Sequence, residues 1–180
     1  NADGVESQQI EHGNKAQKPE DPIKEGYSFI GWYADETLTV EFDFDTEITV
    51  DTIIYAKWEI NTYTLTYTVG ENGTISGDAT QTVEHGSDGT QVEAVPNEGY
   101  HFVKWSDDST ANPRTDTNVT ADITVKATFA INEYTVTFKD YEGNVIDTQT
   151  VKHGEAATAL DAPAREGYIF NGWDKEFTNV

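Results

Sequence analysis

Three histidines recur at matching places in the sequence and are the residues most easily given a chemical role. His12, His85 and His153 are each followed by glycine. A recurring histidine is a candidate metal ligand or general base, because the imidazole titrates near neutral pH. The preceding residue is Glu or Lys, and no second ligand recurs at a fixed offset. We therefore interpret the three histidines as turn residues rather than as a site.

Carboxylates provide a second candidate, because their oxygens suit a hard cation such as Ca²⁺. The acidic run within residues 43–51 lacks the glycine and closing glutamate of an EF-hand loop. We interpret both as solvated acidic surface, with weak cation binding as the alternative. The tighter run consists of Asp43, Asp45, Glu47 and Asp51, and the looser one of Asp107, Asp108, Asp116 and Asp122.

The composition excludes several classes of function. The chain has 33 acidic and 11 basic residues and a formal net charge of −22, so it repels nucleic acid and anionic membrane surfaces. It has no cysteine, which excludes disulfides, thiolate metal sites and cysteine nucleophiles. No apolar run is long enough to span a membrane, and no phosphate-binding loop or nucleophile elbow is present. We predict a protein that is not an enzyme and needs no cofactor.

An aromatic motif repeats three times along the chain. It begins at Gly26, Gly99 and Gly167, and the His-Gly element precedes it at the same distance each time. Aromatic faces suit stacking on sugars, but rings that return to the same place in every copy are typical of core filling. We predict that these nine side chains form the cores: Tyr27, Phe29, Trp32, Tyr100, Phe102, Trp105, Tyr168, Phe170 and Trp173.

Two similar junctions, around Asn61 and Asn132, divide the chain into three copies of one module. We predict a first copy at residues 1–60, a middle copy at 61–131 and a third copy at 132–180. The first copy lacks an opening strand, and the third lacks a closing strand. We expect a piece of a longer array, with completion by neighbouring chains as the alternative. The junctions are too short to act as flexible tethers.

The middle copy shows the elements that must position these residues. Threonine alternates with larger apolar residues over 62–69, which predicts a half-buried antiparallel strand. Further strands are expected over 80–83, over the aromatic motif and over 123–129, and residues 155–163 have room for a short helix. We predict a mainly β chain, α+β at most. Each β-grasp-like module would have a mixed sheet of three to five strands and at most one short helix.

The motif Gly-Tyr-x-Phe-x-Gly-Trp, downstream of a His-Gly turn, resembles the Listeria–Bacteroides repeat, also called the internalin B-repeat. The middle copy is similar to the divergent form, because Lys104 replaces the glycine before the tryptophan and the Asp107–Asp116 loop is longer. The resemblance implies a surface protein of mainly Gram-positive bacteria, a β-grasp-like fold and no catalytic activity. It implies no ligand residues for the family as a whole.

These observations predict a stalk or spacer of a secreted or cell-wall protein that holds a functional domain away from the cell. An adhesive module that binds host glycan or protein through exposed loops such as Asp107–Asp116 is the alternative. The expected partners are neighbouring repeats or a host glycan or protein. Neither nucleic acid nor an inserted membrane is expected as a partner.

Overall fold

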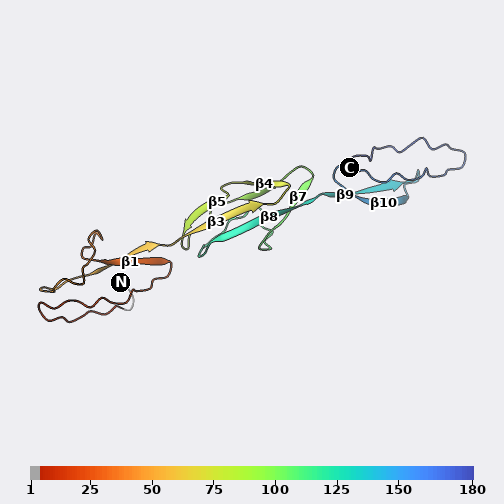
Figure 1. Cartoon of the computed structure of the whole chain (residues 1–180). Helices are drawn as coiled ribbons and strands as arrows, with labels where there is room; N and C mark the ends of the chain where they lie inside the picture. The colour runs from red at the N-terminus through yellow and green to blue at the C-terminus, as the bar shows by residue number, and fades with distance from the viewer. Residues whose placement is uncertain (1–4) are drawn as a thin grey trace. The chain divides into compact units, whose positions relative to one another are not determined.

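The computed structural model describes residues 5–180, which form ten β-strands and no helix (Figure 1). The prediction of a mainly β chain is confirmed. The strands are β1 (Tyr27–Tyr33), β2 (Tyr55–Ile60), β3 (Thr62–Val69), β4 (Gly73–Ser76), β5 (Thr80–Glu84), β6 (Glu93–Pro96), β7 (Tyr100–Trp105), β8 (Ile123–Ile131), β9 (Glu133–Lys139) and β10 (Val145–Lys152).

The chain divides into two compact units, and the middle copy contributes to both. Of the described residues, one unit holds 5–65, 80–90 and 115–123, and the other holds 66–79, 91–114 and 124–180. The division into three modules therefore stays a prediction.

In the first copy, β1 and β2 form a two-stranded antiparallel sheet with a bulge between Phe29 and Gly31. The bulge lets Phe29 pair with Trp58 and Trp32 with Ala56. The ring centroids of Phe29 and Trp58 are 5.4 Å apart in an edge-to-face arrangement, a geometry that aromatic pairs prefer.

The middle copy contains a four-stranded sheet in the order β5-β3-β8-β7. The Thr64 N–H donates to the Asp122 carboxylate and the Gly70 N–H donates to the Ala127 carbonyl. These contacts advance in the same direction along β3 and β8, as in parallel neighbours, whereas β7 and β8 are antiparallel. The mixed sheet is closest to the predicted module.

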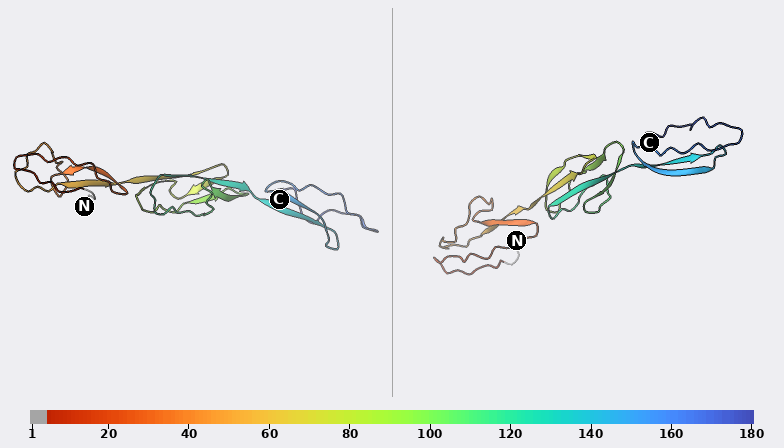
Figure 2. Two further views of the ribbon diagram at one scale, coloured as in Figure 1. Left: turned by 90° about the horizontal axis from the view of Figure 1, so that it is seen from below. Right: turned by 45° about the vertical axis from the view of Figure 1, so that its right-hand side comes forward.

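In the third copy, β9 and β10 form a two-stranded antiparallel sheet and lie side by side in both views of Figure 2. Phe138, Val151 and Ala157 are buried here, with Trp173 and Phe177 packed against them.

The period-two pattern explains why β3 lies where the sequence predicts it. Leu65 and Tyr67 are buried, whereas Thr64 and Thr68 are exposed. Alternation of this kind directs one face of a strand to the core and the other to water. The prediction of strands over 80–83 and 123–129 is confirmed by β5 and β8.

In the third copy, one predicted strand is absent, and the helix for which residues 155–163 have room does not form. Residues 155–163 form no helix, because long-range contacts take up their backbone groups: the Ala157 N–H donates to the Phe177 carbonyl, and the Thr158 N–H to the Gln149 side chain. Tyr168–Trp173 forms no strand, because no neighbouring strand pairs with it within residues 5–180. In both segments, the long-range surroundings outweigh the local preference of the residues for helix or strand.

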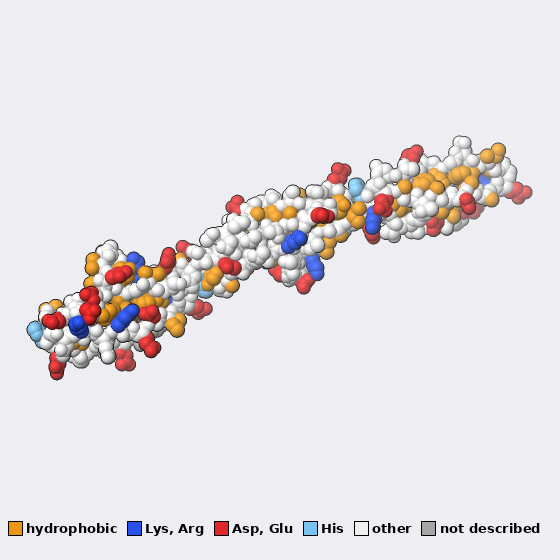
Figure 3. Space-filling view, in the orientation of Figure 1, with side chains coloured by type: hydrophobic (Ala, Val, Ile, Leu, Met, Phe, Trp, Pro, Cys, Tyr) orange, Lys and Arg blue, Asp and Glu red, His pale blue; other side chains and the backbone are white. Residues whose placement is uncertain are grey.

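Acidic side chains are spread over the face shown in Figure 3 rather than gathered in one cluster. The described part of the chain contains no helix that is long and apolar enough to cross a membrane.

Candidate functional site

The two junctions between copies contain nearly identical sets of contacts. We call them the first joint and the second joint. The first joint consists of Gly26, Asn61 and His85. The Asn61 N–H donates to the Gly26 carbonyl over 2.9 Å, and the His85 N–H donates to the Asn61 carbonyl over 2.8 Å. Asn61, the first residue of the middle copy, is thus bonded through its backbone to the first copy and to the His-Gly turn of its own copy.

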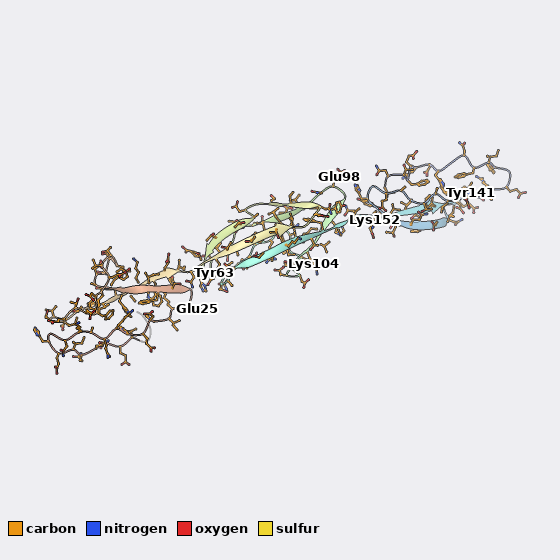
Figure 4. All side chains as sticks on the ribbon, in the orientation of Figure 1. Glu25, Tyr63, Glu98, Lys104, Tyr141 and Lys152 are labelled. Carbon is orange, nitrogen blue, oxygen red and sulfur yellow. The ribbon has the colours of Figure 1, made fainter. Side chains whose placement is uncertain are left out.

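The second joint, Gly99, Asn132 and His153, repeats this arrangement. The Asn132 N–H donates to the Gly99 carbonyl over 2.8 Å, and the His153 N–H donates to the Asn132 carbonyl over 2.8 Å. Each joint lies wholly inside one of the two compact units. Figure 4 labels Glu98 and Lys152, which immediately precede Gly99 and His153 in the chain.

The asparagine side chain adds a different contact in each joint. Asn61 Oδ1 accepts a hydrogen bond of 2.7 Å from the Ser28 hydroxyl. Asn132 Oδ1 lies 2.8 Å from Nδ1 of His101. Both partners are the second residue of the aromatic motif after its glycine, so the motif and the junction meet at one point.

Each joint requires glycine for two reasons. Gly26 has φ of 74° and Gly99 has φ of 79°, in the region that L side chains rarely adopt. In addition, the histidine ring of each joint fills the space that a side chain on the glycine would need. A Cβ atom on Gly26 would lie 2.3 Å from Cδ2 of His85, and one on Gly99 would lie 2.1 Å from Cδ2 of His153.

The histidine rings also contact the strand that follows the junction. The ring of His85 lies 5.9 Å from that of Tyr63, and the ring of His153 lies 6.0 Å from that of Tyr134. The Tyr63 hydroxyl, on the side chain labelled in Figure 4, is 3.4 Å from Nδ1 of His85. These two histidines are held between a glycine and a tyrosine.

The third histidine, His12, is exposed. It shares with the others only its turn: the N–H of the following glycine donates to a distant carbonyl in every copy. The pairs are Gly13 with Ile48, Gly86 with Val119 and Gly154 with Val180.

The nine predicted core aromatics differ in burial from copy to copy. Trp32 and Trp105 are buried, at 8% and 0% exposure, and Trp173 is half-buried. The first two rings of the motif are half-buried in the first and middle copies, whereas in the third they are exposed. The half-buried rings are Tyr27, Phe29, Tyr100 and Phe102, and the exposed ones are Tyr168 and Phe170.

Two of the four candidate cation ligands in the first copy have hydrogen-bond or ion-pair partners. Asp45 forms an ion pair of 2.8 Å with Lys15, and Asp43 accepts a hydrogen bond from the Asp45 backbone. The hydrogen bond and charge of Lys15 lower the pKa of Asp45, and the same pair raises the pKa of Lys15. Glu47 and Asp51 are exposed. Among the described residues, no three carboxylate or histidine side chains gather to hold a metal ion.

The Asp107–Asp116 loop is fastened at three points. The Arg114 guanidinium is buried and bonded to both oxygens of Asp107, at 3.0 and 2.8 Å. The Asn112 side chain accepts from the Ala94 N–H and donates to the Ala94 carbonyl, each over 2.8 Å. The Trp105 indole donates to the Ala111 carbonyl. The sequence suggested the length of this loop but not these anchors.

Comparison with known proteins decides the family. The model of the Listeria–Bacteroides repeat domain matches residues 1–57 and 134–179, and that of the divergent InlB B-repeat domain matches residues 63–133. The chain belongs to the Listeria–Bacteroides repeat family. Both the predicted family and the divergent character of the middle copy are confirmed.

The Listeria–Bacteroides repeats of this chain are similar to segments of three larger proteins. A protein of Evansella cellulosilytica named as a membrane protein is 35% identical over 91% of this chain, and a second from that organism, named as a Gly-rich membrane protein, is 33% identical over 98%. Internalin H of Listeria monocytogenes is 34% identical over 56%. The chain spans 25%, 21% and 18% of their lengths. No solved structure gives a significant match.

Proposed function

We propose that this chain is a non-catalytic stalk segment of a bacterial surface or secreted protein, and that its repeats hold a functional domain away from the cell. The two joints carry the proposal. In each, the asparagine that begins the later copy is bonded to the glycine of the earlier copy and to the histidine of its own copy, and that histidine packs on the same glycine. Such a connection limits bending, because bending would break hydrogen bonds and unpack a ring.

The family and the charge support the same function. Internalin H and two proteins named for membranes contain similar segments, which fits a location at the cell surface or outside the cell. A net charge of −22 favours solubility and makes neighbouring stalks repel one another.

Small-angle scattering of the whole chain tests the proposal. A stalk gives an elongated particle whose maximum dimension changes little with salt, because short-range contacts fix the joints. A compact globule, or a chain that bends freely at residues 61 and 132, contradicts it.

Adhesion is the competing function, and a glycan array with a pull-down from host-cell surface proteins tests it. A stalk binds nothing in either assay. Saturable binding that is lost when the Asp107–Asp116 loop is altered would replace the stalk with the adhesive module.

A further inference from the structure

The middle copy is connected to its neighbours through two strands that lie side by side. β3 begins at Thr62, directly after Asn61 of the first joint. β8 ends at Ile131, directly before Asn132 of the second joint. The two strands are hydrogen-bonded neighbours at the centre of the sheet, between β5 and β7 (Figure 1). A pull along the chain therefore enters the middle copy through β3 and leaves it through β8.

The direction of the two strands decides how such a pull loads them. Three hydrogen bonds advance together along both strands, as in a parallel pair: from the Thr64 N–H to the Asp122 carboxylate over 2.8 Å, from the Thr68 hydroxyl to the Val125 carbonyl over 3.2 Å, and from the Gly70 N–H to the Ala127 carbonyl over 3.1 Å. In a parallel pair, the start of one strand and the end of the other lie at opposite ends of the sheet. Tension on these two points makes the strands slide past each other and loads all their hydrogen bonds at once.

An antiparallel pair joined by a turn behaves differently under the same pull. β9 and β10 form such a pair. Tension on the two open ends of a hairpin separates the strands one hydrogen bond at a time. Because a single hydrogen bond contributes little net free energy, a pair that opens in this way resists force weakly. A pair that must break several bonds in one step resists it strongly.

Buried side chains add to the resistance of β3 and β8. Leu65 and Tyr67 of β3 are 0% and 2% exposed, and Val125 and Ala127 of β8 are 4% and 0% exposed. Sliding of one strand along the other would therefore expose apolar surface to water while it breaks hydrogen bonds. β5 and β7 cover the outer edges of the two strands, so neither strand can be peeled away first from an open edge.

We infer that the middle copy is a load-bearing module, in which β3 and β8 act as a clamp that resists extension of the chain. The contacts of the clamp form inside the compact units: Thr64 and Asp122 belong to one unit, and Thr68 and Val125 to the other. The inference rests on the proposed stalk function for the source of the tension, which would arise between the cell and the domain that the stalk holds. The resistance itself follows from the strand order and direction.

Single-molecule force spectroscopy of the full chain tests the clamp in two pulling geometries. The chain has no cysteine, so handles attach only at introduced ones. Glu59→Cys with Glu133→Cys, two exposed sites on either side of the middle copy, loads the clamp. Ser106→Cys with Lys126→Cys, exposed sites joined by a hydrogen bond between β8 and the end of β7, peels β7 from β8.

The lifetime of the folded middle copy at a constant force reports its unfolding barrier. We expect this lifetime to be at least about tenfold longer in the clamp geometry than in the peeling geometry, because several hydrogen bonds must break together.

A substitution within the clamp separates mechanical resistance from general stability. Asp122→Ala removes the acceptor of the Thr64 N–H, and Asp122 is exposed, so the fold is retained. In the clamp geometry it should shorten the lifetime about fivefold. The matched control Asp108→Ala removes the same charge from a residue that pairs with Lys104, and should change the lifetime less than about twofold. In the peeling geometry, Asp122→Ala should leave the lifetime unchanged, because the clamp is not loaded there.

Three outcomes overturn the inference: equal lifetimes in the two geometries, equal effects of Asp122→Ala and Asp108→Ala, or a lifetime that Asp122→Ala shortens equally in both geometries. Scattering tests the stalk proposal separately. An elongated chain without a clamp contradicts only the load-bearing role, and a compact or freely bending chain with an intact clamp contradicts only the stalk.

Discussion

The imidazole of His153 occupies the space in which a side chain on Gly99 would begin, since a Cβ atom there would lie 2.1 Å from Cδ2 of the ring. His85 has the same relationship with Gly26. A glycine at the start of one aromatic motif thus receives the histidine of the next copy. This contact connects the two most regular motifs of the sequence.

Replacing Gly99, the glycine that contacts His153, should lower the free energy of unfolding by more than the backbone strain of alanine alone accounts for. Gly99 and Gly167 have nearly equal φ, 79° and 77°, but a Cβ atom on Gly167 would have no atom within 4 Å. Both Gly99→Ala and Gly167→Ala incur about 1–2 kcal/mol for the left-handed backbone. Gly99→Ala should cost a further ~1–3 kcal/mol for overpacking, measured by urea unfolding of the full chain. Equal losses would show that the ring contact contributes nothing.

Removing the ring should relieve that penalty. His153→Ala alone should destabilise the chain by about 1 kcal/mol, because a half-buried ring is lost, whereas the exposed His12→Ala should stay within about 0.5 kcal/mol. In the double variant, the cost of Gly99→Ala should fall to that of Gly167→Ala, since the two residues are in contact. Additive losses in this cycle would contradict a direct clash.

The buried tryptophans should respond differently to phenylalanine. Trp105 Nε1 donates to the Ala111 carbonyl over 2.9 Å, whereas the buried Nε1 of Trp32 has no acceptor among the described residues. Trp105→Phe leaves that carbonyl without its donor, and Trp32→Phe removes an unpaired N–H. The loss of unfolding free energy should be about 1–2 kcal/mol greater for Trp105→Phe, measured by thermal and urea unfolding. A greater loss for Trp32→Phe would contradict this.

Asp35 should titrate well below other carboxyls. Its carboxylate accepts hydrogen bonds from the Thr37 hydroxyl, from Thr39 and from the Val40 N–H. The Thr37 contact and these further bonds lower its pKa to about 2. Because the folded pKa lies below the unfolded one, the stabilisation is present above pH ~4 and is lost as the pH falls through ~2. Carboxyl NMR titration measures this pKa, and Asp35→Asn should remove this part of the acid dependence. A pKa near 3.8 would contradict it.

Much of the fold could be predicted because local chemistry repeats. Alternating threonines predicted β3, and β9 has the same alternation. The sequence allowed a short helix over 155–163 but did not decide whether it forms, because no local pattern shows that the Ala157 N–H bonds to the Phe177 carbonyl, 20 residues away. The recurring histidines were interpreted as turn residues, but their role in the joints was missed. The equal spacing of His-Gly and Gly-Tyr motifs was the only available signal.

By itself, the sequence determined the family, the repeats and the mainly β class, because these depend on residue type and spacing along the chain. Only the tertiary structure decided that His85 meets Gly26 rather than a glycine of its own copy, and that Tyr168 is exposed where Tyr100 is half-buried. Such outcomes depend on which strands lie beside one another. Strand pairing is a long-range contact, and identical motifs acquire different surroundings when their neighbours differ.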